Sequence, residues 1–398
     1  MDATNSVSIT GGGYTAQISL IGCQLLSLTH HEDELVVPAS SKTEGAFAGA
    51  VLAPWPNRTA GGSYSYAGTD YSLPVNEEAT GAALHGLMTE LPLLVRAQKD
   101  TEVQLQGTLQ PTAGYPFELE IALTYRVSAD IGLTATLMAR YNAEDEAEQT
   151  HELAVESSTA PAEAAEPAEL TDGTEIQDTE SEEAVSEDGV SEDAVAEEAA
   201  SQDAESENTE SDDSVSNNSV SEDTGSETPV SEHTDTTPSA DDDAAPRPRT
   251  APFGAGFHPY LTAGGASLKE CRLRLPARTM LKTSADGTVT GRKKVTGDFD
   301  LNNGPLLAGR RIDHAFTDLP EEGWTAELVH GPSGFVVRMI ADSPWVQVYT
   351  GERIDRAGVA IEPMTCPPNA LNTGEDLIDL VPGEWFRLGY SIEAIRVD

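Results

Sequence analysis

Two neighbouring stretches of the chain alternate strictly between apolar and mostly polar residues, and this pattern constrains the fold more than any other feature. Every second residue is apolar over 117–127, and after a turn at 129–130 the alternation resumes over 131–139. Successive side chains of a strand point to opposite faces, so a period of two buries one face and exposes the other. One-sided burial of this kind is typical of an antiparallel sheet.

Shorter runs elsewhere repeat the same pattern. Residues 14–29 divide into two alternating runs around Gly22, and hairpin patterns occupy 62–73 and 91–109. Further strand-like runs follow residue 270, and turn residues recur about every ten positions. Outside one acidic stretch no helix-like pattern reaches ten residues. The sequence therefore predicts an all-β protein, folded as a large antiparallel β-sandwich.

The acidic stretch, residues 142–246, differs in composition from the rest of the chain. The whole chain has 68 acidic and 23 basic residues and a net charge of −45, and 35 of the acidic residues lie between positions 142 and 245, where there is no Lys or Arg. The stretch has no aromatic residue and repeats Val-Ser-Glu-Asp, so it offers too little apolar surface to offset the entropy of ordering. We expect a disordered insertion in a surface loop, with a regulatory or partner-binding tail as the alternative and its partner unknown. Residues 1–141 and 247–398 then form one domain.

Charge and cysteine content narrow the class of protein. Outside the insertion 33 acidic residues face 23 basic ones, nothing resembles a basic patch, and nucleic acid is not an expected partner. The three cysteines have neither disulfide nor zinc spacing, which suits a reducing compartment. The chain shows neither a signal peptide nor an 18-residue apolar run, so we expect a cytoplasmic protein without a membrane partner.

Polar residues gather in turns along the chain and form the candidate site. His258 lies between Gly256 and Pro259, in a turn we expect to be an exposed loop where an imidazole can exchange protons near neutral pH. Glu362 ends a strand that we expect to be buried, so its pKa should be raised unless it is paired. Alone, each has an ordinary structural explanation, such as a turn residue, a surface salt bridge or an outward-facing strand residue.

In their order along the chain, these clusters resemble the aldose 1-epimerase (galactose mutarotase) family. The likeness extends over about residues 11–397 without the insertion. The matching segments are Pro56-Asn-Arg58, Leu84-His-Gly86, Gly114-Tyr-Pro-Phe117, Gly256-Phe-His-Pro-Tyr260, Asp313 before Phe316, Gln347-Val-Tyr-Thr-Gly351 and Glu362-Pro-Met-Thr-Cys-Pro-Pro-Asn-Ala370.

The resemblance implies a two-sheet antiparallel super-sandwich with an open sugar-binding cleft. Glu362 matches the family's general base and His258 its general acid. The residues that match sugar-holding positions, or lie beside them, are Asn57, Arg58, His85, Tyr260, Asp313 and Gln347. Phe257 departs from the pattern, because a small or polar residue is commoner before the catalytic His, and we expect it to narrow the access of the sugar.

The implied reaction is the interconversion of α and β anomers of a free aldohexose such as galactose or glucose. A base removes the proton of the C1 hydroxyl while an acid protonates the ring oxygen, the ring opens, C1–C2 rotates, and closure reverses both transfers. A carboxylate and an imidazolium suffice, so no metal or redox cofactor is expected. The sequence agrees, with neither metal-ligand spacing nor a dinucleotide loop.

Three alternatives stay open. A hexose-6-phosphate 1-epimerase shares this architecture but needs at least two basic residues converging on the phosphate, where Arg58 is one and Arg310 or Arg311 could be another. A glycoside hydrolase could use Glu362 and Asp313 as its two carboxylates. A sugar-binding or sensory protein would hold the ligand without turnover.

Overall fold

The computed structural model describes residues 5–143, 249–284 and 288–397, which belong to one compact unit that the chain enters twice. The expected insertion over 142–246 lies outside the described residues, except for Asn142 and Ala143. The regular secondary structure of the described residues is almost entirely antiparallel β-sheet, as the sequence predicts. Two eight-stranded sheets form the sandwich, and a smaller sheet packs beside them.

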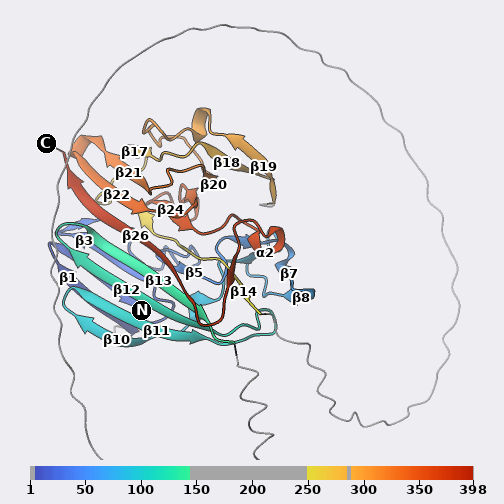
Figure 1. The fold of residues 1–398 in the computed structure, drawn as a ribbon. Coiled ribbons are helices and arrows are strands. Elements are labelled where there is room, and N and C mark those ends of the chain that lie inside the picture. The colour runs from blue at the N-terminus through green and yellow to red at the C-terminus, as the bar shows by residue number, and fades with distance from the viewer. Residues whose placement is uncertain (1–4, 144–248, 285–287, 398) are drawn as a thin grey trace, which may run out of the picture. The chain divides into compact units, whose positions relative to one another are not determined.

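The first large sheet has the order β10-β11-β12-β13-β26-β22-β21-β17. Its strands are β10 (Leu94–Lys99), β11 (Glu102–Leu109), β12 (Leu119–Ser128), β13 (Gly132–Tyr141), β17 (Cys271–Arg274), β21 (Trp324–His330), β22 (Phe335–Ala341) and β26 (Trp385–Arg396). The alternating stretches that open the sequence analysis are β12 and β13. Figure 1 shows β13, in green, beside β26, in red, and the two strands pair from Leu133 with Ile392 to Arg140 with Trp385. The segments before and after the acidic stretch therefore share one sheet.

The second large sheet has the order β19-β18-β20-β23-β24-β15-β5, with β16 also paired to β24. Its strands are β5 (Val51–Leu52), β15 (Gly256–Phe257), β16 (Tyr260–Leu261), β18 (Thr279–Thr283), β19 (Val289–Lys294), β20 (Asp313–Thr317), β23 (Trp345–Tyr349) and β24 (Val359–Met364). Aromatic side chains join the two large sheets. Phe257 of β15 packs edge-on against Tyr390 of β26, with ring centroids 4.7 Å apart.

The third sheet contains β1 (Ser6–Gly11), β2 (Tyr14–Ser19), β3 (Leu25–His30) and β4 (Asp33–Glu34) in that order. One face is apolar and fully buried, with Ala16, Ile18 and Leu28 each 0% exposed. The opposite face of β1, β2 and β3 carries only Ser, Thr and Gln side chains over the positions Ser6, Ser8, Thr10, Thr15, Gln17, Ser19, Ser27 and Thr29.

Short elements complete the described structure. The two-stranded pairs are β14 (Ala251–Phe253) with β25 (Ile378–Leu380), β6 (Arg58–Thr59) with β9 (Ala83–Leu84), and β7 (Ser63–Tyr66) with β8 (Thr69–Ser72). The one α-helix of the described residues is α2 (Ala370–Thr373). Turns of 3₁₀ helix cover Ala60–Gly62, Met88–Glu90, Gly297–Phe299, Gly331–Ser333 and Glu352–Ile354.

The two hairpins expected from the sequence are confirmed here. The hairpins at 62–73 and 91–109 are β7–β8 and β10–β11, and among the described residues no helix reaches ten residues. All three cysteines are buried and free. No helix in the described ranges is long and apolar enough to cross a membrane.

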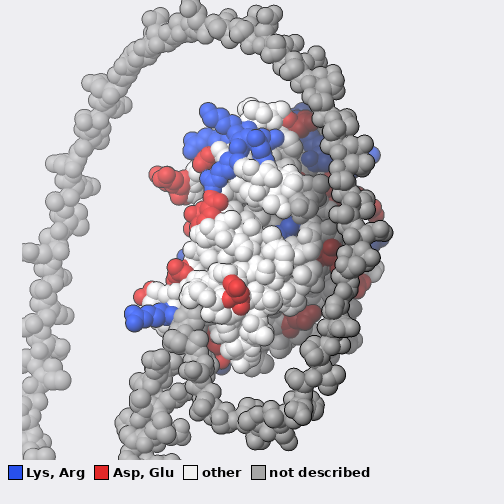
Figure 2. Space-filling model, turned by 90° about the vertical axis from the view of Figure 1, so that its right-hand side faces the viewer, with Lys and Arg blue, Asp and Glu red and all other residues white. Residues whose placement is uncertain are grey.

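One expectation about charge needs correction. Figure 2 shows Lys and Arg side chains gathered at one end of the face it draws. The hairpin β18–β19, at the same end in Figure 1, carries Lys282, Arg292, Lys293 and Lys294. The expectation that the protein has no basic patch is therefore wrong at this hairpin, because strand pairing brings together residues that are separated in sequence. Arg292 pairs with Glu375 and lies 5.0 Å from the Trp345 ring, and Lys293 lies 4.7 Å from the Phe299 ring.

Candidate active site

Neighbouring strands of the second sheet bring four predicted site residues together. Asp313 begins β20, Gln347 lies in β23 and Glu362 in β24, and these strands are adjacent. Gln347 is opposite Glu362 in the pairing, and Gln347 Nε2 donates a hydrogen bond to Asp313 Oδ1 at 2.6 Å. His258 lies in the bend between β15 and β16, both of which pair with β24. The sheet thus collects groups that lie up to about a hundred positions apart in sequence.

Two loops form the other side of the site, and two hydrogen bonds between Asn57 and His85 connect them. The backbone N–H of Asn57 donates to His85 Nδ1 at 3.2 Å, and the backbone N–H of His85 donates to the Asn57 carbonyl at 2.9 Å. Both residues have left-handed backbone angles, with φ of 56° and 66°. Such conformations cost energy and cluster at functional sites. Because Nδ1 accepts a hydrogen bond, the proton of the neutral imidazole lies on Nε2.

All eight predicted site residues line one cavity of about 80 Å³. They are Asn57, Arg58, His85, His258, Tyr260, Asp313, Gln347 and Glu362. The lining also contains residues that the sequence analysis missed, among them Phe47, Glu77, Tyr349 and Arg353. Phe47 and Glu77 lie in turns without a distinguishing local pattern. Tyr349 belongs to the matched segment Gln347-Val-Tyr-Thr-Gly351, so the alternation of β23 from Gln347 could have indicated it.

His258 is buried, contrary to the expectation of an exposed loop, with 4% of its surface accessible. Its Nε2 lies 3.3 Å from Glu362 Oε1. Burial, with a smaller contribution from the positive charge of Arg353, lowers the pKa of His258 to about 4. The expected narrowing by Phe257 is also wrong. Phe257 is 1% exposed and packs on Tyr390 in the core, because adjacent residues of an extended chain point in opposite directions.

Glu362 is the most deeply buried charged group of the site, at 1% exposure. Burial raises its pKa well above the ordinary value, the charge of Asp313 raises it further, and Arg58 opposes the shift. The sequence prediction of a raised pKa at this position is therefore confirmed. Burial therefore favours the neutral form of both members of the pair, the protonated carboxyl of Glu362 and the neutral imidazole of His258.

Unpartnered polar atoms concentrate at this cavity. Among the described residues five buried side-chain atoms lack a hydrogen-bond partner, and three of them are His258 Nδ1, Gln347 Oε1 and Glu362 Oε2. A buried polar atom without a partner is costly, and native proteins keep few of them. Their presence around one cavity indicates a site built for a ligand that supplies several hydrogen-bonding groups.

Arg58 is held by an acidic residue that the sequence analysis did not select. Its Nε and Nη2 donate to the two oxygens of Glu77 at 2.6 and 2.8 Å. Arg353 approaches the same carboxylate at 3.4 Å, and Thr80 donates to it at 2.6 Å. These partners lower the pKa of Glu77, the Arg58 hydrogen bond most of all. Asp313, by contrast, pairs with Gln347 and not with Arg311.

Three side chains of the site also bring potential metal-ligand atoms close together. One atom each from His85, His258 and Glu362 lies within 4.8 Å of the others. A histidine ligates through an unprotonated nitrogen. Nδ1 of His85 is engaged by the backbone N–H of Asn57, and its Nε2 carries the proton. This donor set therefore does not fit a metal ion, and His85 is arranged to donate a hydrogen bond.

Two large antiparallel sheets, with a buried Glu–His pair on one of them, define the galactose mutarotase-like super-sandwich. A comparison with models of protein families identifies the family within this class. The family model described as aldose 1-epimerase matches residues 5–147 and 234–393, so the chain belongs to the aldose 1-epimerase family. The resemblance in the sequence is confirmed, and the family match is interrupted within the acidic stretch.

Individual relatives agree with this assignment. The chain is 28% identical over 394 residues to the Escherichia coli (strain K12) protein YihR, itself described as uncharacterized. The alignment covers 98% of this chain and 94% of YihR. The solved structure of the GalM/aldose epimerase homologue from C. elegans superposes with a TM-score of 0.66 at 14% identity, covering 99% of both chains. The galactose 1-epimerase from Lactobacillus acidophilus NCFM gives a TM-score of 0.60 at 13% identity, covering 98% of this chain and 94% of that one. At such identities the two structures support the fold alone.

Proposed function

We propose that this protein is an aldose 1-epimerase, which interconverts the α and β anomers of free aldohexoses such as galactose or glucose. The observation that carries the proposal is the buried contact of 3.3 Å between His258 and Glu362, with unpartnered atoms of both residues at a polar cavity. Membership of the aldose 1-epimerase family supports the reaction class.

In the proposed reaction Glu362 takes the proton of the C1 hydroxyl and His258 gives a proton to the ring oxygen. The C1–O5 bond breaks and leaves an open-chain aldehyde with a hydroxyl on C5. After rotation about C1–C2, that hydroxyl adds to the other face of the aldehyde. The two proton transfers reverse, and both residues return to their starting states. General acid–base catalysis of this kind contributes a factor of about 10² to 10⁴.

The proton count of the pair suits this cycle. Burial favours the state in which Glu362 and His258 hold one titratable proton between them, because it raises the pKa of Glu362 and lowers that of His258. A sugar hydroxyl that donates to Glu362 Oε2 favours the carboxylate form, and the proton then lies on His258 across the 3.3 Å contact. The imidazolium expected from the sequence is thus a form that substrate binding favours.

The remaining lining residues can hold the hydroxyls of the ring. Asp313 and the unpartnered Gln347 Oε1 are acceptors, while Arg58 and the Nε2–H of His85 are donors. The cavity of about 80 Å³ is smaller than the usual range for small-molecule sites, about 300–1,000 Å³, so a hexose requires side chains to move. The Arg353 side chain, which is 55% exposed, is one charged lining group that can move.

The phosphosugar alternative is less well supported. The two arginines of the lining, Arg58 and Arg353, both contact Glu77, which neutralises part of their charge. Arg310 donates instead to backbone carbonyls near Gly297, and neither Arg310 nor Arg311 lines the cavity. A phosphate would need charge-assisted contacts that these arginines already make with protein.

The test is the mutarotation rate of fresh α-D-galactose and α-D-glucose, followed by polarimetry with and without the protein. We expect clear acceleration, with kcat/KM at least as high as for glucose 6-phosphate and little change at moderate salt. A preference for the 6-phosphate that weakens with salt would instead support the phosphosugar epimerase. Binding of galactose without acceleration would support the non-catalytic alternative, and release of sugar from nitrophenyl galactosides would support the hydrolase.

A further inference from the structure

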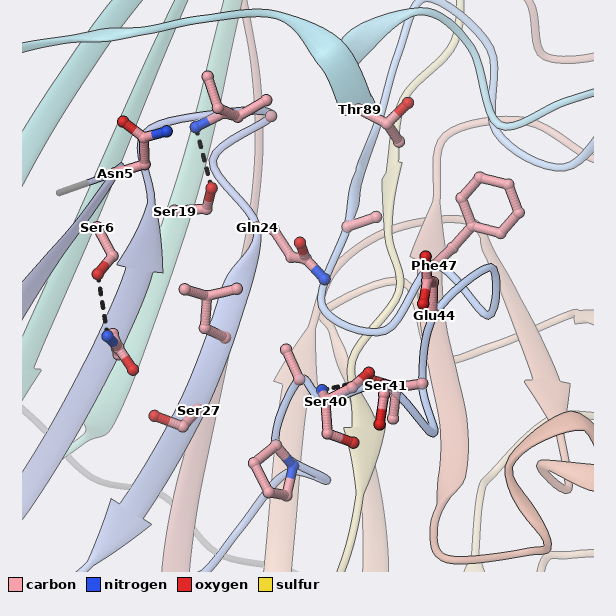
Figure 3. A pocket seen from close by; sticks show the side chains of 18 of the residues that line it. Asn5, Ser6, Ser19, Gln24, Ser27, Ser40, Ser41, Glu44, Phe47 and Thr89 are labelled. Atoms are coloured by element: carbon pink, nitrogen blue, oxygen red, sulfur yellow. Dashed lines mark hydrogen bonds between the residues drawn. The ribbon is translucent and has the colours of Figure 1, made fainter. Parts of the chain in front are cut away.

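Residues 46–50 close one side of the cavity of about 80 Å³ that holds the Glu–His pair, the catalytic cavity. The N–H of Leu25 in β3 donates to the Gly49 carbonyl at 2.9 Å, and the N–H of Gly49 donates to the His258 carbonyl at 2.8 Å. Figure 3 shows Phe47, which belongs to this segment, in the lining of a separate cavity of about 940 Å³. A sugar must therefore enter the catalytic cavity from another side.

The exposed side of the catalytic cavity is formed by Asp313 and Arg353. Of the fourteen described residues that line the cavity, these two are exposed and the others are buried or half-buried. The Arg353 side chain is 55% exposed, whereas Glu362 and His258 are 1% and 4% exposed. The reacting pair therefore lies at the floor of the cavity, and Asp313 and Arg353 form its mouth.

Arg353 belongs to a turn whose backbone is fixed on both sides of it. The N–H of Arg353 donates to the Tyr349 hydroxyl at 2.7 Å, and the next side chain, Ile354, is buried. Arg356 ties the same turn to the chain before β20, because its Nη1 donates to the Arg310 carbonyl at 2.8 Å. The backbone that carries Arg353 therefore has a defined place beside the mouth.

The side chain of Arg353 is held less firmly than this backbone. Its Nη2 lies 3.4 Å from Glu77 Oε1, whereas Arg58 donates two hydrogen bonds of 2.6 and 2.8 Å to the same carboxylate. An ion pair with an exposed partner contributes little to stability, because water screens it. Arg353 can therefore leave Glu77 and donate to a ligand, while Arg58 keeps Glu77 paired.

The positions of the reacting groups set the direction of the sugar ring. In the proposed reaction Glu362 meets the C1 hydroxyl and His258 meets the ring oxygen, so the C1–O5 edge of the pyranose lies at the floor. Across the six-membered ring C4 is opposite C1, and C3 is opposite O5. The C3–C4 edge then faces the mouth, where Asp313 offers an acceptor and Arg353 offers donors.

We propose that Arg353 is a further substrate-binding residue, which donates a hydrogen bond to a hydroxyl on the C3–C4 edge of the bound aldose. The inference rests on the proposed function and specifies how its site recognises the substrate. Galactose and glucose differ in configuration at C4, so a donor at this edge also contributes to the preference between them.

The test measures dissociation constants by saturation-transfer NMR titration for galactose and its 2-deoxy, 3-deoxy and 4-deoxy analogues, with the full-length protein. The variant Arg353→Met keeps the length of the side chain and removes its donors. The matched control is Arg311→Met, because Arg311 is also an exposed arginine, lies two residues before Asp313 and does not line the cavity.

In the wild type, loss of the C3 or the C4 hydroxyl should weaken binding at least fivefold relative to galactose. Arg353→Met should reduce that penalty to less than twofold, and Arg311→Met should leave it unchanged. The C2 hydroxyl lies next to C1 at the floor, so the penalty for its loss should be the same in the wild type and in both variants.

The inference is overturned if neither the C3 nor the C4 hydroxyl matters to the wild type, if the penalty persists in Arg353→Met, or if Arg311→Met abolishes it equally. These constants do not depend on turnover, so the inference and the proposed function fail separately. The expected penalties without mutarotation refute the proposed function and leave the contact of Arg353 standing. Mutarotation without a penalty that depends on Arg353 refutes the inference alone.

Discussion

Replacement of Glu77 by Gln isolates the residue that holds Arg58 at the rim of the catalytic cavity. Glu77 accepts two hydrogen bonds from Arg58, at 2.6 and 2.8 Å, and contacts Arg353 at 3.4 Å. A glutamine has nearly the same shape but no charge, and its one oxygen can accept only part of this network. Arg58 should then sample orientations in which it no longer meets the sugar.

The magnitude follows from the bonds that are lost. A hydrogen bond to a charged group contributes about 1.5–3 kcal/mol. Arg58 is 21% exposed and Glu77 is 7% exposed, so water replaces part of the loss, and we use the lower end of that range. Since about 1.4 kcal/mol corresponds to a factor of ten, kcat/KM should fall by roughly 10- to 30-fold. Most of the change should appear in KM, because the proposed role of Arg58 is to hold the sugar in the ground state and in the transition state alike.

The assay is steady-state mutarotation of galactose, with the melting temperature as a check on folding. The control is Glu102→Gln, because Glu102 pairs with Arg126 through bonds of 2.9 and 2.7 Å on the first large sheet, outside the catalytic cavity. Glu102→Gln should leave the kinetics unchanged. An unchanged kcat/KM in Glu77→Gln, or an equal loss in both variants, would refute the positioning role of Glu77.

Three further predictions follow from the same structure. The pH profile of kcat/KM for galactose should have two limbs. Activity should fall below about pH 4, where protonation of His258 leaves the pair without a base, and again well above pH 4.5, where deprotonation of Glu362 leaves it without an acid. A single limb near pH 6.5 would contradict this. The raised pKa of folded Glu362 gives stability that is complete below its unfolded pKa and is lost as pH rises through the folded value. The melting temperature of Glu362→Gln relative to wild type should therefore increase as pH rises above about 4.5, and a constant difference would count against this. Replacement of residues 148–233, which the family model leaves unmatched, by a short Gly/Ser linker should preserve folding and mutarotation, and loss of either would show that the stretch is structural or catalytic.

Much of the fold could be predicted because strand alternation is a local signal. The period of two in β12 and β13 gives both their existence and their buried faces. The region from β18 to β21 was harder, since β19 has no fully buried position and its residues resemble a polar loop. Its place at the edge of the second sheet depends on pairing with β18, which a local pattern does not encode.

The candidate site was predictable for a different reason. Its eight residues belong to local motifs that, in order, resemble those of one family, and the structure brings all eight around one cavity. Glu77 was missed because an acidic residue in a polar turn has no local mark of its pairing with Arg58. The burial of His258 was also missed, because the Gly- and Pro-rich turn that carries it is covered by residues 46–50 from a distant part of the chain.

The most direct test of the account measures α–β exchange of D-galactose at equilibrium by magnetisation-exchange NMR, for the wild type, Glu362→Gln, His258→Asn and the double variant. The account predicts that the wild type accelerates exchange and that each single variant stays folded, binds galactose and exchanges it at least about 100-fold more slowly. The double variant should be little slower than either single one, because the two residues act as a unit. Near-normal exchange in Glu362→Gln or in His258→Asn would contradict the central claim that this buried pair carries out the reaction.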